Sequence, residues 1–253
     1  MTHFDFANRV VLIGGGSGGI GVAVARQFLE AGAKVAIVGR SQVRLDEAIS
    51  ELEEIGTPCD SLQAYAADLS HWEEQERVAK QVQQSLGRLD IVVNSAGLWA
   101  FTPIDALDDD LVDNFVDVNL KTVVYGVKMA RHFMGKGGSV VNLGSFAGVI
   151  PMANASLYSA LKSAVGTFTQ SASAELAPFG IRVNCVIPGV IRTPMTSDYI
   201  DSNYEKIISP IPIGRVGEAF EVASGVLFLC SDLASYITGA TLEITGGKFS
   251  TQG

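Results

Sequence analysis

Short apolar runs rich in β-branched residues alternate along the chain with longer stretches in which apolar and polar positions mix. The runs are almost continuously apolar, which is typical of strands buried on both faces of a parallel sheet. They predict strands at Val10–Ile13, Lys34–Val38, Leu62–Ala66, Ile91–Val93, Ser139–Leu143, Arg182–Ile187 and Thr241–Ile244.

The longer stretches have helical spacing, and three of them are followed by a glycine, the usual stop of a helix. They predict helices at Gly19–Ala31, Gln42–Ile55, His71–Leu86, Leu107–His132, Ser156–Ala177 and Phe220–Cys230. The alternation predicts a single Rossmann-type, doubly wound α/β domain over residues 1–253, with a mostly parallel, about seven-stranded sheet flanked by helices. The segment 190–217, rich in Pro, Ile and Ser, is expected to form a long substrate loop.

Composition narrows the classes of function. Hydrophobic residues make up 47% of the chain, enough for a large core, and the formal net charge of −9 argues against a nucleic-acid partner. No apolar run reaches membrane-span length and no signal peptide opens the chain, so neither membrane insertion nor secretion is expected. The three cysteines and three histidines are scattered, which predicts a reducing, cytoplasmic location and no metal site.

Tyr158 and Lys162 stand four residues apart, so on a helix they share one face. A nearby ammonium lowers the pKa of a phenol from its usual ~10, which suits an acid or base working near neutral pH. Ser145 lies thirteen residues before the tyrosine and could hold a substrate oxygen during proton transfer. The pair alone is a weak signal, because about 0.2 such pairs are expected by chance with six tyrosines and eight lysines.

A glycine-rich turn at residues 14–21 follows the first predicted strand and opens the first predicted helix. Glycines let another backbone approach closely, and the free N–H groups of a helix N-terminus bind phosphate. The turn therefore predicts a dinucleotide site, although its spacing, G-x-x-x-G-x-G, differs from the common G-x-G-x-x-G. The contacts are expected from Gly15, Ser17, Gly18, Gly19 and Ile20.

This glycine spacing, together with Ser145, Tyr158 and Lys162, resembles the short-chain dehydrogenase/reductase family over nearly the whole chain. The resemblance implies that Asn119 joins them in a catalytic tetrad. Tyr158 would donate a proton to a carbonyl oxygen, or remove it in the reverse direction, while Ser145 holds that oxygen. Lys162 would lower the pKa of Tyr158 and bind the nicotinamide ribose, and Asn119 would hold a water chain leading to Lys162. Taken alone, Ser145 could instead cap a turn and Asn119 could brace a helix bend.

The same resemblance implies further contacts with a nicotinamide dinucleotide. Asp68-Leu69 matches an adenine-contacting element, residues 94–97 match N-N-A-G with a serine as the second residue, and residues 188–193 match P-G-x-x-x-T. The implied contacts are Asp68, Leu69, Asn94, Ala96, Gly97, Tyr158, Lys162, Pro188, Gly189, Ile191 and Thr193. Two positions depart from the pattern, since Gly14 replaces a usual Thr and Thr245 replaces the Asp of a usual D-G-G.

The end of the second strand bears on the choice between NADP(H) and NAD(H). An acidic residue there would bind the ribose hydroxyls of NAD and repel a 2′-phosphate. This chain has Gly39 instead, followed by Arg40 and Ser41, which can offer a guanidinium and a hydroxyl to a phosphate. The sequence therefore favours NADP(H) over NAD(H), with a solvated Arg40 as the alternative.

The residues expected around the substrate are mostly apolar, which favours an apolar or medium-sized ketone or secondary alcohol. The candidates for the substrate pocket are Trp99, Phe146, Met152 and Met195, with Leu98, Phe101, Ile150 and Tyr199 beside them. Ordinary core or loop packing is the alternative for each of them.

Three alternative functions stay open. The chain also resembles the 3-oxoacyl carrier-protein reductases, which bind an acidic carrier through basic residues; Lys136 stands at one such place and Phe179 at the other. The other two are a non-catalytic NADP-sensing protein and an epimerase or dehydratase. The family resemblance also implies a homotetramer in which the helices Leu107–His132 and Ser156–Ala177 pack between subunits.

Overall fold

The centre of the molecule is a seven-stranded sheet whose neighbouring strands all run parallel, in the order β3-β2-β1-β4-β5-β6-β9. The computed structural model describes residues 4–56, 58 and 60–248. The strands are β1 (Val10–Gly14), β2 (Lys34–Gly39), β3 (Leu62–Ala66), β4 (Ile91–Asn94), β5 (Gly138–Leu143), β6 (Ile181–Pro188) and β9 (Thr241–Ile244). Every predicted strand is confirmed, with each boundary correct to within one residue.

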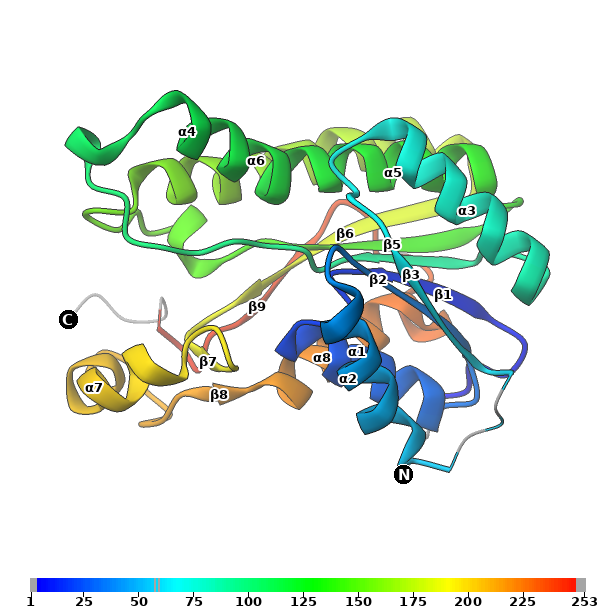
Figure 1. The fold of residues 1–253 in the computed structure, drawn as a ribbon, viewed down its shortest axis with the longest axis horizontal. Helices are drawn as coiled ribbons and strands as arrows, with labels where there is room; N and C mark the ends of the chain where they lie inside the picture. Colours follow the sequence, from blue (N-terminus) through cyan, green and yellow to red (C-terminus); the bar gives the residue numbers. More distant parts are fainter. Residues whose placement is uncertain (1–3, 57, 59, 249–253) are drawn as a thin grey trace.

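Helices cover both faces of the sheet, so the molecule has three layers (Figure 1). On one face lie α3 (Trp72–Leu86), α4 (Asp109–Val116), α5 (Thr122–Phe133) and α6 (Ser156–Leu176). On the other face lie α1 (Gly19–Glu30), α2 (Gln42–Glu53) and α8 (Ala219–Cys230). This arrangement confirms the Rossmann-type, doubly wound α/β fold.

The continuous apolar runs have a direct structural cause, because successive side chains of a strand point to opposite faces of the sheet. In β1, Val11 and Ile13 belong to the core under α1, α2 and α8. Val10 and Leu12 belong to the core under α3, α5 and α6. Since both faces are covered by helices, every position of such a strand is selected to be apolar.

The expected burial on both faces does not extend to the two edge strands. In β9, Thr241 and Glu243 are exposed while Leu242 and Ile244 are half-buried, and each residue of β3 is half-buried or exposed. An edge strand has a neighbour on one side only, so the helices cover it less completely.

The predicted helix Leu107–His132 is wrong as a single element, because it is broken in the middle. The structure has α4, then a π-helical turn at Asp117–Lys121, then α5. The first helix of this region, α4, also begins later than predicted, at Asp109. The side chain of Asp108 caps it by accepting a hydrogen bond of 2.8 Å from the N–H of Leu111. The π-helical turn contains Asn119, so the break lies at a predicted functional residue.

The sequence suggested one long loop at residues 190–217, but the structure shows regular elements there. The segment contains β7 (Ile191–Arg192), α7 (Ser197–Ile208) and β8 (Gly217–Glu218), and β7 pairs with β8 in a separate two-stranded sheet. A small apolar cluster holds this segment together, formed by Ile200, Ile207, Ile211 and Val216. In Figure 1 the segment lies beyond one end of the main sheet, away from α3.

Candidate functional site

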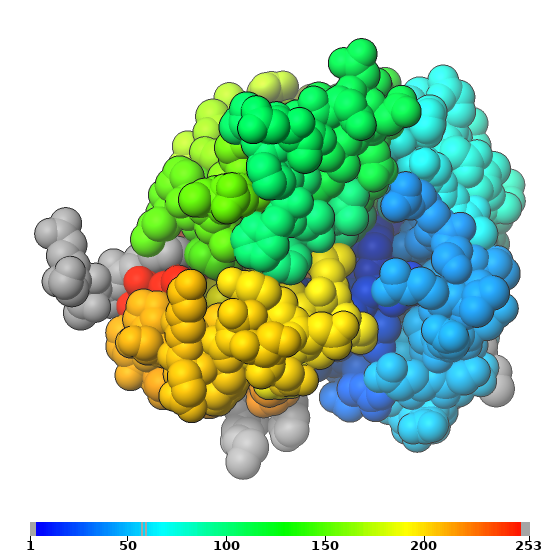
Figure 2. All heavy atoms as spheres, turned by 60° about the vertical axis from the view of Figure 1, so that its left-hand side comes forward, coloured from blue at the N-terminus to red at the C-terminus, as the bar shows by residue number. Residues whose placement is uncertain are grey.

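A cleft of about 320 Å³ opens at the carboxyl ends of the strands, where the strand order reverses between β1 and β4. Its walls are the glycine-rich turn, the ends of β2, β4, β5 and β6, and the first turn of α7. Figure 2 shows a hollow between the green, yellow and light-blue segments, with dark-blue residues at its floor. In doubly wound sheets this is the place where ligands bind.

The cleft gathers most of the residues that the sequence pointed to. Those that line it are Gly15, Ser17, Gly18, Gly19, Ile20, Arg40, Asp68, Leu69, Ala96, Gly97, Trp99, Ser145, Phe146, Met152, Tyr158, Lys162, Pro188, Gly189, Ile191, Thr193 and Met195. Ser41, Asn94 and Asn119 are not among the residues that line it. Arg44 and Thr122 line it although the sequence did not single them out.

The glycine-rich turn forms a concave backbone surface in which side chains would not fit. Gly15 has a φ of +77°, and a Cβ atom there would lie 2.5 Å from the backbone nitrogen of Ala96. A Cβ atom on Gly21 would lie 2.2 Å from the carbonyl oxygen of Gly15. The first N–H groups of α1 follow directly and have no partner within their own helix. The turn therefore fits the pyrophosphate of a dinucleotide.

Two arginines stand where the adenosine end of a dinucleotide would lie. Arg40 follows β2, and Arg44 reaches across from the first turn of α2, its Nη2 donating a hydrogen bond of 3.3 Å to the carbonyl oxygen of Ser17. In the described part of the chain, neither arginine forms an ion pair with a carboxylate. Ser41 instead caps α2, its Oγ accepting a hydrogen bond of 3.4 Å from the N–H of Arg44.

Asp68, the acidic residue at the end of the cleft where adenosine would lie, is held in its ionised form. Burial raises the pKa of its carboxyl group, but hydrogen bonds from Ser70 and the charge of Arg40 outweigh burial and leave that pKa below its usual value. The Ser70 N–H and hydroxyl donate to Asp68 Oδ1 over 3.0 and 2.8 Å. One carboxylate oxygen is thus occupied, and the carboxylate remains an acceptor for an adenine amino group.

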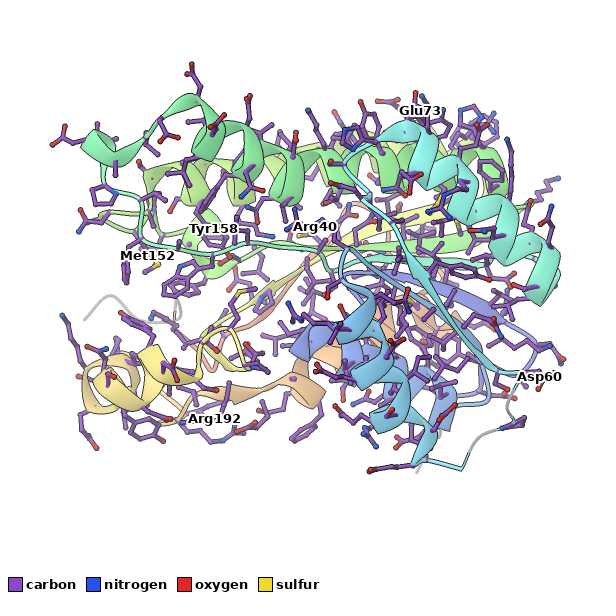
Figure 3. All side chains as sticks on the ribbon, in the orientation of Figure 1. Arg40, Asp60, Glu73, Met152, Tyr158 and Arg192 are labelled. Carbon is purple, nitrogen blue, oxygen red and sulfur yellow. The ribbon has the colours of Figure 1, made fainter. Side chains whose placement is uncertain are left out.

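Tyr158 lies near the start of α6 and Ser145 lies two residues after the end of β5, and both side chains line the cleft. Burial raises the pKa of Tyr158, and the neighbouring Ser145 side chain lowers it by less, so the phenol keeps its proton at neutral pH. Ser145 Oγ also accepts a hydrogen bond of 3.2 Å from the N–H of Ala147, so it does cap the following turn. In Figure 3, Tyr158 and Met152 lie between the α6 layer and the α7 segment.

Lys162 is buried one turn further along α6. Its Nζ donates a hydrogen bond of 3.0 Å to the carbonyl oxygen of Leu143 and lies 5.8 Å from the centre of the Tyr158 ring. Burial lowers the pKa of Lys162 to about 8, against a smaller opposing effect of Cys185. The net shift of the Tyr158 pKa is upward, with burial and Ser145 as its causes, so the lowering expected from Lys162 stays a prediction.

Asn119 lies behind the wall of the cleft rather than at its surface. Its Oδ1 accepts a hydrogen bond of 3.1 Å from the N–H of Leu98, and its Nδ2 donates to the carbonyl oxygens of Leu98 and Phe115 over 3.0 and 3.1 Å. Asn119 therefore braces the helix break, which the sequence analysis gave as the alternative to a catalytic role. A Cβ atom on Gly97 would lie 3.5 Å from Lys162 Nζ and 3.6 Å from Asn119 Oδ1, so both groups face Gly97.

The loop after β6 closes the other side of the cleft against the glycine-rich turn. A Cβ atom on Gly19 would lie 2.9 Å from the Cβ of Thr193, so the two segments are in close contact. The N–H of Thr193 donates a hydrogen bond of 3.0 Å to Thr196 Oγ1, which fixes the loop next to α7. A Cβ atom on Gly189 would lie 2.9 Å from the Cα of Thr245, so the residue that replaces the usual Asp packs against this loop.

Aromatic and thioether side chains form the remaining end of the cleft. The rings of Trp99, Phe101 and Tyr199 are 5.2 to 5.6 Å apart, centre to centre, in all three pairings. They join the loop after β4 to α7. Met195 is 54% exposed at the mouth, so this apolar end is open to a ligand.

The chain matches a family model described as enoyl-(acyl carrier protein) reductase over residues 15–248. The chain belongs to the short-chain dehydrogenase/reductase family. It is therefore an NAD(P)-dependent dehydrogenase or reductase.

Similar members of this dehydrogenase/reductase family act on different substrates. A 3-oxoacyl-acyl-carrier-protein reductase of Thermotoga maritima is 36% identical, over 94% of this chain and 97% of that protein. A 3alpha-hydroxysteroid dehydrogenase of Mediterraneibacter gnavus is 34% identical, over 96% of this chain and 98% of that protein. The crystal structure of a short-chain dehydrogenase/reductase from Brucella melitensis superposes with a TM-score of 0.92 at 32% identity, covering 98% of this chain and 99% of that one.

Two further observations concern what the described residues contain. No helix among them is both long and apolar enough to cross a membrane. They also include no group of three or more His, Cys, Asp or Glu side chains arranged to hold a metal ion.

Proposed function

We propose that this enzyme interconverts a ketone and a secondary alcohol with NADP(H), using Tyr158 as the general acid and base. The observation that carries the proposal is that Tyr158 and Ser145 line one cleft together with an apolar end and a phosphate-binding turn, with Ser145 close enough to lower the pKa of Tyr158. A hydride acceptor placed there would have its oxygen beside two hydroxyl groups and its carbon beside the cofactor space.

The roles of the side chains follow from their protonation. When bound, the nicotinamide supplies a hydride to the carbonyl carbon or accepts one from the alcohol. Tyr158, protonated at neutral pH, donates its proton to the carbonyl oxygen, and Ser145 donates a hydrogen bond to the same oxygen as negative charge develops. Lys162 places a positive charge near the phenol and would bind the ribose. Asn119 Oδ1 accepts one backbone hydrogen bond, and its second acceptor site would hold a water that leads to Lys162.

The preference for NADP(H) is supported by Arg40 and Arg44 together. Both arginines line the cleft and form no close ion pair among the described residues, although Arg40 is near enough to Asp68 to lower its pKa, so a 2′-phosphate could be bound by either or both. Arg40→Asp should lower kcat/KM for NADPH by about 100-fold and raise it for NADH, since a charged hydrogen bond is replaced by repulsion. Lys80→Asp on α3 is the matched control. Equal efficiency with both cofactors, unchanged in Arg40→Asp, would refute the preference.

The reaction is tested by a screen of ketones and alcohols with NADPH and NADP⁺, followed at the nicotinamide absorbance. Turnover of apolar, medium-sized ketones is expected, because Trp99, Phe146, Met152 and Met195 supply an apolar pocket without a basic cluster. Binding of NADPH with no turnover of any ketone or alcohol would favour a cofactor-sensing protein instead. Isomerisation of a sugar nucleotide would favour an epimerase.

A carrier-protein thioester is the second candidate substrate. Lys136 is exposed after α5, and Arg131 stacks 3.4 Å above the ring of Phe179, so two basic groups stand near the expected docking position. Acidic carrier proteins bind such basic surfaces. Faster reduction of an acetoacetyl-carrier protein than of a simple ketone, reduced by Arg131→Glu, would support this candidate.

The proposal includes one domain over residues 1–253 and a homotetramer that packs α5 and α6 between subunits. Family membership supports both. Sedimentation at micromolar concentration tests the assembly, and a monomer would contradict it.

A further inference from the structure

A chain of three buried side-chain hydrogen bonds runs beneath the cleft. Asn94 Nδ2 donates to Asn142 Oδ1 over 2.8 Å, and Asn142 Nδ2 donates to Thr169 Oγ1 over 2.9 Å. Thr169 Oγ1 then donates to the carbonyl oxygen of Val165 over 2.7 Å. Asn142 and Thr169 are 0% exposed and Asn94 is 4% exposed. We call the side chains of Asn94, Asn142 and Thr169 the amide relay.

Each member of the amide relay belongs to an element that forms one wall of the cleft. Asn94 ends β4 and leads into the loop at residues 95–99. Asn142 lies in β5, three residues before Ser145, and pairs in register with Asn94. Thr169 lies in α6, two turns after Lys162. The amide relay therefore connects β5, which ends two residues before Ser145, with α6, which carries Tyr158.

The amide relay has a fixed polarity. Every amide N–H or hydroxyl in it donates in one direction, so replacing one member leaves a buried neighbour without its partner. The packing around it is equally strict, since a Cβ atom on Gly126 of α5 would lie 2.1 Å from Asn94 Oδ1. Apolar contacts between α6 and the sheet tolerate small shifts of the helix along its axis, whereas a direct hydrogen bond is lost by such a shift.

Two polar contacts thus hold α6 against β5. One is the hydrogen bond from Lys162 to Leu143, and the other is the hydrogen bond from Asn142 to Thr169, two turns away. A helix held at two points along its axis cannot slide without breaking one of them. Proton transfer needs heavy atoms about 2.6–3.2 Å apart, and a misplacement of about 1 Å can cost about 100-fold in rate.

We propose that the amide relay is a positioning device, which sets the position of α6 along β5 and thereby the distance between Tyr158 and Ser145. Asn94, Asn142 and Thr169 do not line the cleft, so they act as positioning residues through the elements that carry them. The inference rests on the proposed function, in which Tyr158 and Ser145 act on the same oxygen.

The test compares Thr169→Val, which keeps the shape but removes the hydroxyl, with Thr169→Ser, which keeps the hydroxyl. Thr167→Val, exposed on the same helix, is the matched control. For Thr169→Val, kcat should fall by about 10- to 100-fold with the NADPH dissociation constant unchanged, because only the proton-transfer geometry is altered. The solvent deuterium isotope effect on kcat should rise, and Thr169→Ser should restore kcat to within about 3-fold.

A merely structural role would lower the melting temperature but leave kcat per folded molecule and the isotope effect unchanged, and that result would overturn the proposal. If Thr169→Val does not fold, Thr169→Ala gives the same comparison. Should the wild type reduce no ketone, the proposed function fails, and crystal structures still decide on the amide relay. They should show a longer Tyr158–Ser145 separation in Thr169→Val, and an unchanged separation would overturn the inference.

Discussion

Replacing Lys162 with methionine should stabilise the cofactor-free enzyme while removing its activity. Methionine has a similar length but no charge, so it relieves the cost of burying an ammonium group. The pKa of Lys162 falls from 10.5 to about 8, and this shift corresponds to about 3 kcal/mol of stability. The lost hydrogen bond to the Leu143 carbonyl offsets about 1 kcal/mol of that gain.

The sign of the pH dependence follows from the direction of the shift. Between pH 8 and pH 10.5 the unfolded chain holds more protons at Lys162 than the folded one, so the stability of the wild type rises with pH in this window. Below pH 8 the full cost of the buried charge is present. The advantage of Lys162→Met should therefore be about 2 kcal/mol at pH 7 and close to zero at pH 10.

Thermal unfolding followed by circular dichroism without cofactor measures this difference. Lys162→Met should melt roughly 4–8 °C above the wild type at pH 7, and at nearly the same temperature at pH 10. Lys206→Met, an exposed lysine of α7, should leave the melting temperature nearly unchanged. A lower melting temperature for Lys162→Met at pH 7, or an equal advantage at both pH values, would refute the reasoning.

Three further predictions concern the cofactor, the packing and the proton. Arg44→Gln should weaken NADPH binding by about 10-fold in a fluorescence titration and leave NADH binding unchanged, and equal losses for both would contradict a role at the 2′-phosphate. Gly126→Ala should lower the free energy of unfolding by about 2–3 kcal/mol in urea, because its Cβ meets Asn94; wild-type stability would show that α5 can shift freely. Since the pKa of Tyr158 is raised, the phenol stays protonated between about pH 6 and pH 9, so ketone reduction should stay level there while alcohol oxidation speeds up with the growing ionised fraction; an oxidation rate that does not change with pH would exclude the phenol as the base.

The strands and the glycine-rich turn were predictable because their signals are local. A run such as Val10–Ile13 is apolar at every position only when helices cover both faces of the strand. The cleft residues then follow from the rule that ligands bind at the carboxyl ends of such strands. The family motifs supplied the rest of the predicted contacts.

The errors arose where tertiary contacts decide the local structure. The helix break at Asn119 depends on hydrogen bonds to Leu98, 21 residues away, which no helical spacing reveals. α7 is stabilised by a small isoleucine cluster inside a Pro- and Ser-rich segment, so composition hid it. Arg44 could have been noted as a second arginine four residues after Arg40, but its approach to Ser17 depends on how α2 packs.

Asn142 illustrates a signal that was visible but not interpretable. A polar side chain inside an otherwise apolar strand must find a hydrogen-bond partner when it is buried. Its partners, Asn94 and Thr169, lie 48 and 27 residues away. The sequence alone could indicate that a partner exists, but only the fold identifies it.

The most direct test of the proposed chemistry is the turnover of Tyr158→Phe with NADPH and the best ketone found in the screen. Phenylalanine keeps the ring and removes the proton that the carbonyl oxygen should receive. We expect kcat to fall by about 10³-fold or more while the NADPH dissociation constant stays within about 2-fold of the wild type. Turnover retained at the wild-type rate would contradict Tyr158 as the proton donor.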